Sequence, residues 1–131
     1  MARRAVKTAD APAPVGPYSQ GVVAAGVLYC SGQVPLDPVS GELVEGGAAE
    51  QARRCLESLD AVCREAGGTL ADAARLTIYL TDLGEFGEVN EAYAEFFSEP
   101  HPARSAIEVS ALPKGAMVEI EAIVPLPEQS A

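Results

Sequence analysis

The chain is short of positive charge. Its 131 residues include nine Lys and Arg against 19 Asp and Glu, which leaves a formal charge of −10 and an isoelectric point near 4.4. Proteins bind phosphate backbones through clustered Lys and Arg, so this balance argues against nucleic acid as the main partner. The small group of cations at Arg3, Arg4 and Lys7 does not change that expectation.

Histidine, cysteine and long apolar runs are also scarce. The single His101 cannot by itself build a zinc site or a catalytic triad. Cys30, Cys55 and Cys63 lack C-x-x-C spacing, and an odd number of Cys fits a disulfide framework poorly, so we expect no metal and a reducing, cytoplasmic location. The longest apolar run, residues 22–30, is too short to span a bilayer, and the basic N-terminus lacks the apolar segment of a secretory signal. We therefore expect no membrane partner.

What remains is an ordinary globular composition, 48% hydrophobic and 21% charged. A chain of this length fits one domain, residues 1–131, with enough residues to bury a core. We find no internal repeat and no low-complexity linker.

Hydrophobic periodicity predicts two helices and several strands. Apolar residues recur at steps of three and four from residue 48 to residue 66, and Gly67-Gly68 then ends the pattern, which predicts a first helix. Asp82 with Glu85 predicts the cap of a second helix that runs to about Ser98. Strands are expected at residues 5–8, 75–81, 104–109 and 117–124. Residues 21–31 are expected to form either one strand or a hairpin pair bent at Gly26.

This order predicts an α+β fold, a mixed six-stranded sheet with two helices packed on one face. The last strand is also apolar at Met117 and Ile123 on its second face, and no further element remains to cover that side. We therefore expect a homo-oligomer in which sheet faces sheet.

Two predicted strands near the C-terminus carry the charges of a candidate site. Arg104 opens one strand, where its planar guanidinium can grip a carboxylate, although pairing with Glu108 is an equally simple explanation. Glu119 and Glu121 share one side of the next strand. On a solvated face they would be unremarkable, whereas near a buried subunit boundary one would need a partner or would have a raised pKa suited to proton transfer. The loop between the strands leaves their distance from Arg104 open.

Further short motifs are not specific when taken singly. Tyr18 fits an aromatic plug in a turn, Ser31 a hydroxyl at a strand end, and Asn90 a helix-surface amide. Taken together and in order, from about residue 7 to residue 124, the motifs resemble the RidA/YjgF/UK114 family. The motifs are Gly16-Pro17-Tyr18-Ser19-Gln20, Ser31-Gly32-Gln33, Val89-Asn90, Pro102-Ala103-Arg104-Ser105 and Val118-Glu119-Ile120-Glu121-Ala122.

The resemblance implies a chorismate-mutase-like fold and a homotrimer with inward-facing sheets and sites in the clefts between subunits. It also implies hydrolysis of reactive 2-imino or enamino acids, such as 2-iminobutanoate and 2-iminopropanoate, to 2-keto acids and ammonia without a metal or cofactor. This chemistry would make the protein a metabolite-repair enzyme. By matching motifs, Arg104 would grip the substrate carboxylate and Glu119 would position or activate water, while Tyr18, Ser31 and Asn90 would shape the pocket.

Two departures from the family pattern bear on substrate range. By the resemblance, Ala106 would line the substrate pocket at a position where many relatives carry Cys, so no thiol would be available there. The loop from Ser98 to His101 is short, which leaves the role of His101 open.

Three other functions remain as alternatives. A non-catalytic trimer that binds small carboxylates, or a chaperone-like protein, would need only Arg104. A ribonuclease or translation inhibitor fits poorly with the charge of −10. A chorismate-mutase-type isomerase would need more cations than Arg104 and Lys114.

Overall fold

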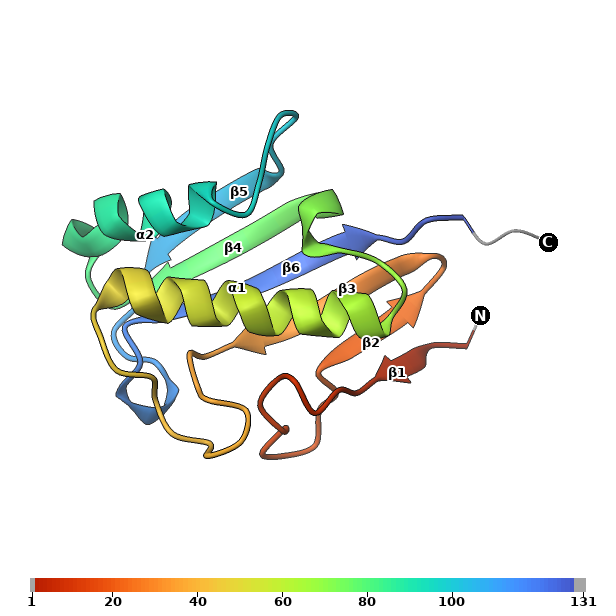
Figure 1. Cartoon of the computed structure of the whole chain (residues 1–131), viewed down its shortest axis with the longest axis horizontal. Coiled ribbons are helices and arrows are strands. Elements are labelled where there is room, and N and C mark those ends of the chain that lie inside the picture. Colours follow the sequence, from red (N-terminus) through yellow and green to blue (C-terminus); the bar gives the residue numbers. More distant parts are fainter. Residues whose placement is uncertain (1, 129–131) are drawn as a thin grey trace.

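The computed structural model describes residues 2–128 (Figure 1). Six strands, two α-helices and three short 3₁₀ helices follow one another along the described chain. The elements are β1 (Arg4–Val6), β2 (Gly21–Ala24), β3 (Val27–Gln33), α1 (Ala48–Glu65), η1 (Leu70–Asp72), β4 (Arg75–Leu80), η2 (Leu83–Glu85), α2 (Phe86–Ala94), β5 (Ala103–Glu108), η3 (Pro113–Gly115) and β6 (Val118–Pro125).

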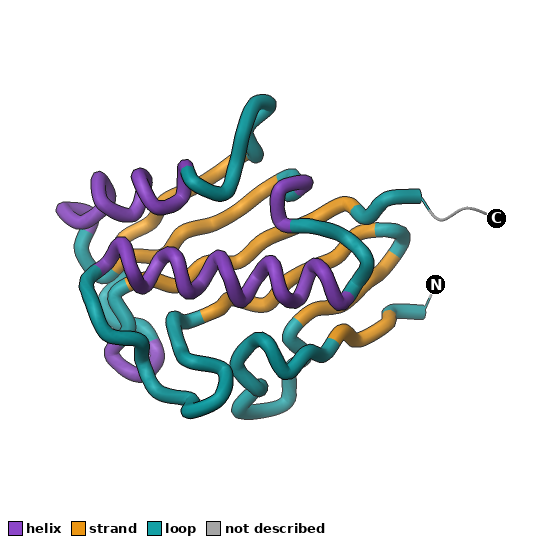
Figure 2. The backbone as a smooth tube through the Cα atoms, viewed as in Figure 1, coloured by secondary structure: helices purple, strands orange, loops and turns teal. Residues whose placement is uncertain are grey.

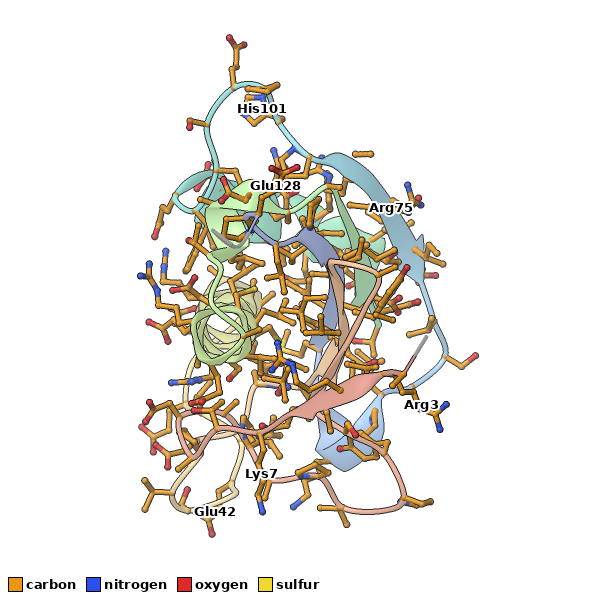
Figure 3. All side chains as sticks on the ribbon, turned by 90° about the vertical axis from the view of Figure 1, so that its right-hand side faces the viewer. Arg3, Lys7, Glu42, Arg75, His101 and Glu128 are labelled. Carbon is orange, nitrogen blue, oxygen red and sulfur yellow. The ribbon has the colours of Figure 1, made fainter. Side chains whose placement is uncertain are left out.

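The strands form one mixed sheet in the order β1-β2-β3-β6-β4-β5. Only β4 and β5 pair in parallel, and the other neighbours are antiparallel. Both helices lie on the same side of this sheet, as Figures 1 and 3 show, and α1 packs on β6 and β3. The expected α+β architecture, a mixed six-stranded sheet with two helices on one face, is thus confirmed.

Helix α1 forms where the apolar period predicts it. Its buried stripe includes Cys55, Leu59 and Val62, each with no exposed surface, and it packs into the core between helix and sheet. The helix ends as expected, because Gly67 has φ +92 and the amide of Gly68 donates to the carbonyl of Cys63 at 2.9 Å.

The second helix is shorter than predicted. Asp82 accepts the amide of Gly84 and so caps η2, and α2 ends at Ala94 rather than near Ser98. The amide of Phe96 donates to the carbonyl of Tyr93, three residues back, at 3.0 Å, which closes a tighter turn. The prediction overran because the residues after the turn stay apolar, and Phe97 returns to the core with its ring 4.6 Å from that of Tyr93.

Strand β3 contains an irregularity that shapes the site. Its partners on β6 step from Ala122, opposite Cys30, to Ile120, opposite Gln33, so three steps on β3 face two on β6. One extra residue of this kind is a β-bulge, which bends a strand and redirects its side chains. Beyond the bulge, the long loops before β2 and after β3 lie at the same end of the molecule (Figure 2).

The face of the sheet opposite the helices, which we call the outer face, has no covering element among residues 2–128. Tyr29, Ile107 and Ile123 are exposed there by 49%, 45% and 36%. Tyr29 pairs with Ile123 across β3 and β6, so the apolar surface is continuous between these strands. Such a surface is typical of a face that meets another molecule.

The core side holds the three cysteines. Cys30, Cys55 and Cys63 are all free thiols and all buried. Among the residues described, no helix has the length and hydropathy to cross a membrane, and no three His, Cys, Asp or Glu side chains are grouped to hold a metal ion.

Candidate active site

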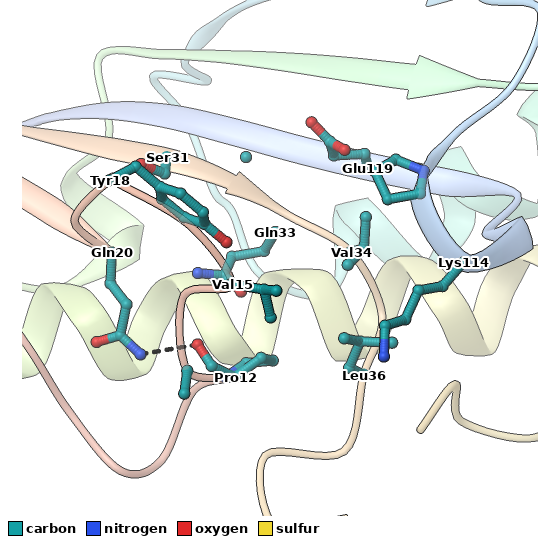
Figure 4. Close-up of a pocket in the computed structure, with 13 residues that line it drawn as sticks. Pro12, Val15, Tyr18, Gln20, Ser31, Gln33, Val34, Leu36, Lys114 and Glu119 are labelled. Atoms are coloured by element: carbon teal, nitrogen blue, oxygen red, sulfur yellow. Dashed lines mark hydrogen bonds between the residues drawn. The ribbon is translucent and has the colours of Figure 1, made fainter. Parts of the chain in front are cut away.

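A pocket of about 520 Å³ lies where β3 leaves the sheet (Figure 4). Residues from the loop before β2, from β3, from η3 and from β6 line it. Three predicted site residues meet here, Tyr18, Ser31 and Glu119. We call this the Glu119 pocket.

Glu119 lies on the outer face of the sheet, opposite Tyr79 of β4. Its carboxylate rests against the backbone of Gly32, where a Cβ atom would lie 2.3 Å from Oε2. Partial burial, and next the negative charge of Glu121, raise the pKa of Glu119. A carboxyl group with a raised pKa is a stronger base than an ordinary Glu.

Glu121, the second acid of β6, already accepts a hydrogen bond from a neighbouring strand. The hydroxyl of Tyr79 donates to its Oε1 at 2.6 Å, and this bond is the main reason that the pKa of Tyr79 rises to about 12. No hydrogen bond to the carboxylate of Glu119 is found among residues 2–128. Of the two acids, Glu119 is therefore the one available to a ligand or a water molecule.

Two polar side chains of this pocket form hydrogen bonds with the protein backbone rather than being free for a ligand. The hydroxyl of Ser31 donates to the carbonyl of Ser19 at 2.6 Å. The amide of Gln20 accepts from the amide of Thr8 and donates to three carbonyls of the loop between β1 and β2. Ser31 thus fixes the loop that carries Tyr18, whose side chain is more than half exposed.

Arg104 lies in a second pocket of about 430 Å³, lined also by Asn90, Tyr93 and His101. The Nη1 atom of Arg104 donates to Oδ1 of Asn90 at 2.7 Å. Its guanidinium carbon lies 4.8 Å from the ring centroid of Tyr93 and 5.1 Å from that of Phe86, within cation–π range. We call this the Arg104 pocket.

The simple pairing of Arg104 with Glu108 is not found. Glu108 accepts the backbone amide of Leu83 at 2.9 Å instead. The guanidinium is therefore held by one amide and two rings, while Nε and Nη2 have no hydrogen-bond partner among residues 2–128. It is an exposed cation with a fixed direction.

Ala106 lies two residues beyond Arg104 on β5, opposite Ile78. It is half-buried and packs against the core, so a methyl group is all that it presents toward this side of the sheet. Neither pocket described above is lined by it.

Within one chain the structure does not bring Arg104 and Glu119 together. Arg104 pairs with Leu76, a fully buried core residue, and so belongs to the helix side of the sheet. Glu119 pairs with Tyr79 and belongs to the outer face. Because successive residues of a strand point to opposite faces, this separation is built into the register of β4 with its two neighbours.

Some features of the site were missed by sequence reasoning. The spacing of Phe86 and Tyr93 fits an apolar helix face and does not indicate that Arg104 lies over them. The approach of Glu119 to Gly32 depends on the bulge in β3, which leaves no pattern in the sequence. Gln33, which also lines the Glu119 pocket, belongs to the Ser31-Gly32-Gln33 motif, but its position at a strand end does not indicate contact with a ligand.

Comparison with known proteins agrees with this architecture. Residues 8–126 match the family described as Endoribonuclease L-PSP. The 2-iminobutanoate/2-iminopropanoate deaminase of Homo sapiens is 43% identical over 94% of this chain and 90% of its own. The crystal structure of RidA from the Antarctic bacterium Psychrobacter sp. PAMC 21119 has a TM-score of 0.90 at 45% identity, covering 94% of this chain and 99% of that one.

E. coli TdcF, solved with bound serine, has a TM-score of 0.87 at 37% identity and covers 95% of this chain and 99% of its own. Sequence and fold therefore agree over nearly the whole length, and the chain belongs to the RidA/YjgF/UK114 family, whose family model carries the description Endoribonuclease L-PSP.

Proposed function

We propose that this protein hydrolyses reactive 2-imino and enamino acids to 2-keto acids and ammonia, as a cytoplasmic homotrimer that needs no cofactor. The relatives named as deaminases support the reaction. The arrangement of Arg104 and Glu119 supports the assembly.

The observation that carries the proposal is the division of the site between two faces. Arg104 and Asn90 lie in one pocket and Glu119, Tyr18 and Ser31 in another, on opposite sides of the same sheet. A substrate that contacts both Arg104 and Glu119 therefore needs the former from one subunit and the latter from its neighbour. A closed ring of identical subunits repeats that contact at every boundary.

Arg104 binds the substrate carboxylate. Asn90 already occupies Nη1, so Nε and Nη2 remain to form two parallel hydrogen bonds with the two carboxylate oxygens. The rings of Tyr93 and Phe86 hold the guanidinium plane in place, which reduces the freedom lost on binding. Because the imine carbon is bonded to the substrate carboxylate, binding of that carboxylate by Arg104 also fixes the position of the imine carbon.

Glu119 acts on water. Its carboxylate takes a proton from a water molecule as the oxygen of that water bonds to the imine carbon, and the electrons of the C=N bond move to nitrogen. The proton then passes to nitrogen, the C–N bond breaks, and ammonia leaves as the hydroxyl loses its proton to form the keto group. One imine and one water give one keto acid and one ammonia, with no change of oxidation state.

The reaction requires little from the protein, and Arg104 and Glu119 can provide what it requires. An imine carbon is already electrophilic, so orientation by Arg104 and proton transfer by Glu119 are the two contributions required. The nuclease suggested by the family description would instead need positive charge along a nucleic acid, and the chain has ten more acids than bases.

The test couples the protein to a pyridoxal-phosphate-dependent threonine dehydratase, which releases the imine, and measures 2-ketobutanoate formation with semicarbazide trapping the free imine. The wild type is expected to accelerate keto-acid formation, and Arg104→Ala and Glu119→Gln to lose that acceleration. Arg104→Lys is the matched variant, because it keeps the charge but loses the bidentate fork, and it should retain only part of the rate. If the wild type binds 2-keto acids through Arg104 without any acceleration, the protein is a binding protein instead.

A further inference from the structure

The Glu119 pocket is lined by an amide side chain that the reaction above does not use. Gln33 is 6% exposed and lines the pocket, yet no hydrogen bond from its side chain to another described residue is found. The amide of Gln33 is therefore available to whatever fills the pocket.

The other buried glutamines of the chain show what a structural amide looks like. Gln20, 2% exposed, makes four hydrogen bonds within its loop. Gln51, 5% exposed, accepts the backbone amide of Met117 at 2.8 Å. Gln33 is equally buried but holds no backbone in place, so its amide differs from both.

The pocket around Gln33 is larger than the small imino acids require. Its volume of about 520 Å³ is within the range of pockets that hold drug-sized ligands. Apart from Glu119 and Gln33 the wall is mostly apolar, with Val15, Val34 and Leu36 among its members (Figure 4). This combination fits a side chain of several atoms with one polar group.

The charge of the surroundings narrows the choice of that polar group. Glu119 and the chain's formal charge of −10 disfavour a second carboxylate. The amide of Gln33 offers both a donor and an acceptor, and a carboxamide satisfies both at once. Lys114, at the edge of the pocket, donates to the carbonyl of Gly41 at 3.3 Å.

We propose that Gln33 and the apolar wall of the Glu119 pocket form a side-chain subsite for 2-imino acids whose uncharged side chain ends in a carboxamide. Gln33 is a specificity-determining residue that pairs amide to amide. This inference rests on the proposed function, because it assumes that the reacting carbon lies near Glu119.

The test compares L-glutamine with L-norleucine, two stable amino acids of similar length of which only the first has an amide. Calorimetric titration of the full chain is expected to give a Kd about tenfold lower for glutamine, a difference that corresponds to one well-placed hydrogen-bonded pair. Gln33→Met, which keeps length and removes the amide, should abolish this preference. The matched variant Gln51→Met should keep it.

Thermal unfolding separates the two glutamines independently of any ligand. Gln51→Met should lower Tm because it removes a bond to Met117, whereas Gln33→Met should leave Tm unchanged or raise it. Equal losses of Tm in the two variants would overturn the proposal, as would a glutamine preference that survives in Gln33→Met. So would a wild type that does not distinguish the two ligands.

Turnover distinguishes this inference from the proposed function. Imines generated from alanine and from glutamine by an L-amino-acid oxidase, with catalase present to remove peroxide, are followed through keto-acid release. If the protein accelerates the hydrolysis of neither imine while glutamine binding depends on Gln33, the subsite proposal is supported and the deaminase proposal is rejected. If both imines are hydrolysed at a ratio that Gln33→Met does not change, the deaminase stands and the subsite falls.

Discussion

At the scale of single residues, Gly32 is a position where a side chain would collide with Glu119. A Cβ there would lie 2.3 Å from Oε2 of Glu119, nearer than real Cβ atoms come. Gly32→Ala should push the carboxylate aside and lower kcat/KM for imine hydrolysis by roughly tenfold to a hundredfold, because small displacements of a proton-transfer group are costly. Gly87→Ala is the control, since its added Cβ would meet nothing within 4 Å and should leave kcat/KM unchanged.

The ionised carboxylate of Glu119 serves the proposed reaction but lowers the stability of the folded protein. Because its pKa is raised in the folded protein, the folded state binds the proton more tightly than the unfolded state, and the ionised form lowers stability at neutral pH. Glu119→Gln should therefore raise Tm at pH 7 while lowering kcat by about 10²–10⁴-fold.

The gain in Tm should shrink as pH falls through the raised pKa of Glu119, where the wild type becomes neutral at this site. Tm measured from pH 4 to pH 8 tests the sign. Glu91→Gln, on the exposed surface of α2, should give no such pH-dependent gain. A Tm for Glu119→Gln below that of the wild type at pH 7 would contradict the expected cost of the charge.

At the scale of elements, α2 contains a glycine that neither backbone conformation nor a close contact requires. Gly87 is exposed in the first turn of α2, has an ordinary helical backbone, and has open space where a Cβ would be. Gly87→Ala should stabilise the protein by about 0.5 kcal/mol, because alanine loses less backbone freedom in a helix. Urea denaturation with an unchanged m-value checks this, and a loss of stability would point to an undetected constraint on α2.

The elements also show how far the sequence could predict this fold. Local patterns were sufficient for α1 and for the β2–β3 hairpin, whose turn at Ala25-Gly26 has φ +52 and +77. They failed at the end of α2, because Phe97 packs from a turn rather than from a helix. Periodicity records which residues are apolar and not whether the backbone between them is still helical.

The candidate site was predictable only in its residue types. The residue types of Arg104 and Glu119 indicate carboxylate binding and proton transfer, and of the two acids on β6 it is Glu119 whose pKa is raised by burial. The faces on which they lie depend on how β4 pairs with both β5 and β6. Such register is set by contacts between distant segments, which no local pattern contains.

At the scale of the whole molecule, a site shared between subunits predicts complementation. Arg104→Ala and Glu119→Gln should each be inactive alone. When the two are unfolded together in equal amounts and refolded, a boundary is intact if one side keeps Arg104 and the other keeps Glu119. Random assembly makes about one quarter of the boundaries intact, so about a quarter of wild-type activity should return.

The control mixes the two variants without unfolding, which should restore nothing while subunits do not exchange. Sedimentation confirms that both samples have the same oligomeric state. Refolded mixtures that remain inactive would mean that each site lies within one chain.

The three thiols buried between the helices and the sheet allow the rate of unfolding of the protein to be measured. Burial raises the pKa of Cys55, so hardly any thiolate is present, and no reagent reaches it without an opening of the core. Labelling by a thiol reagent should therefore proceed only as fast as molecules unfold, with all three positions modified together. Mass spectrometry of partly labelled samples should show unmodified and triply modified chains with little between them, and the rate at which the second species grows measures how long a native molecule survives.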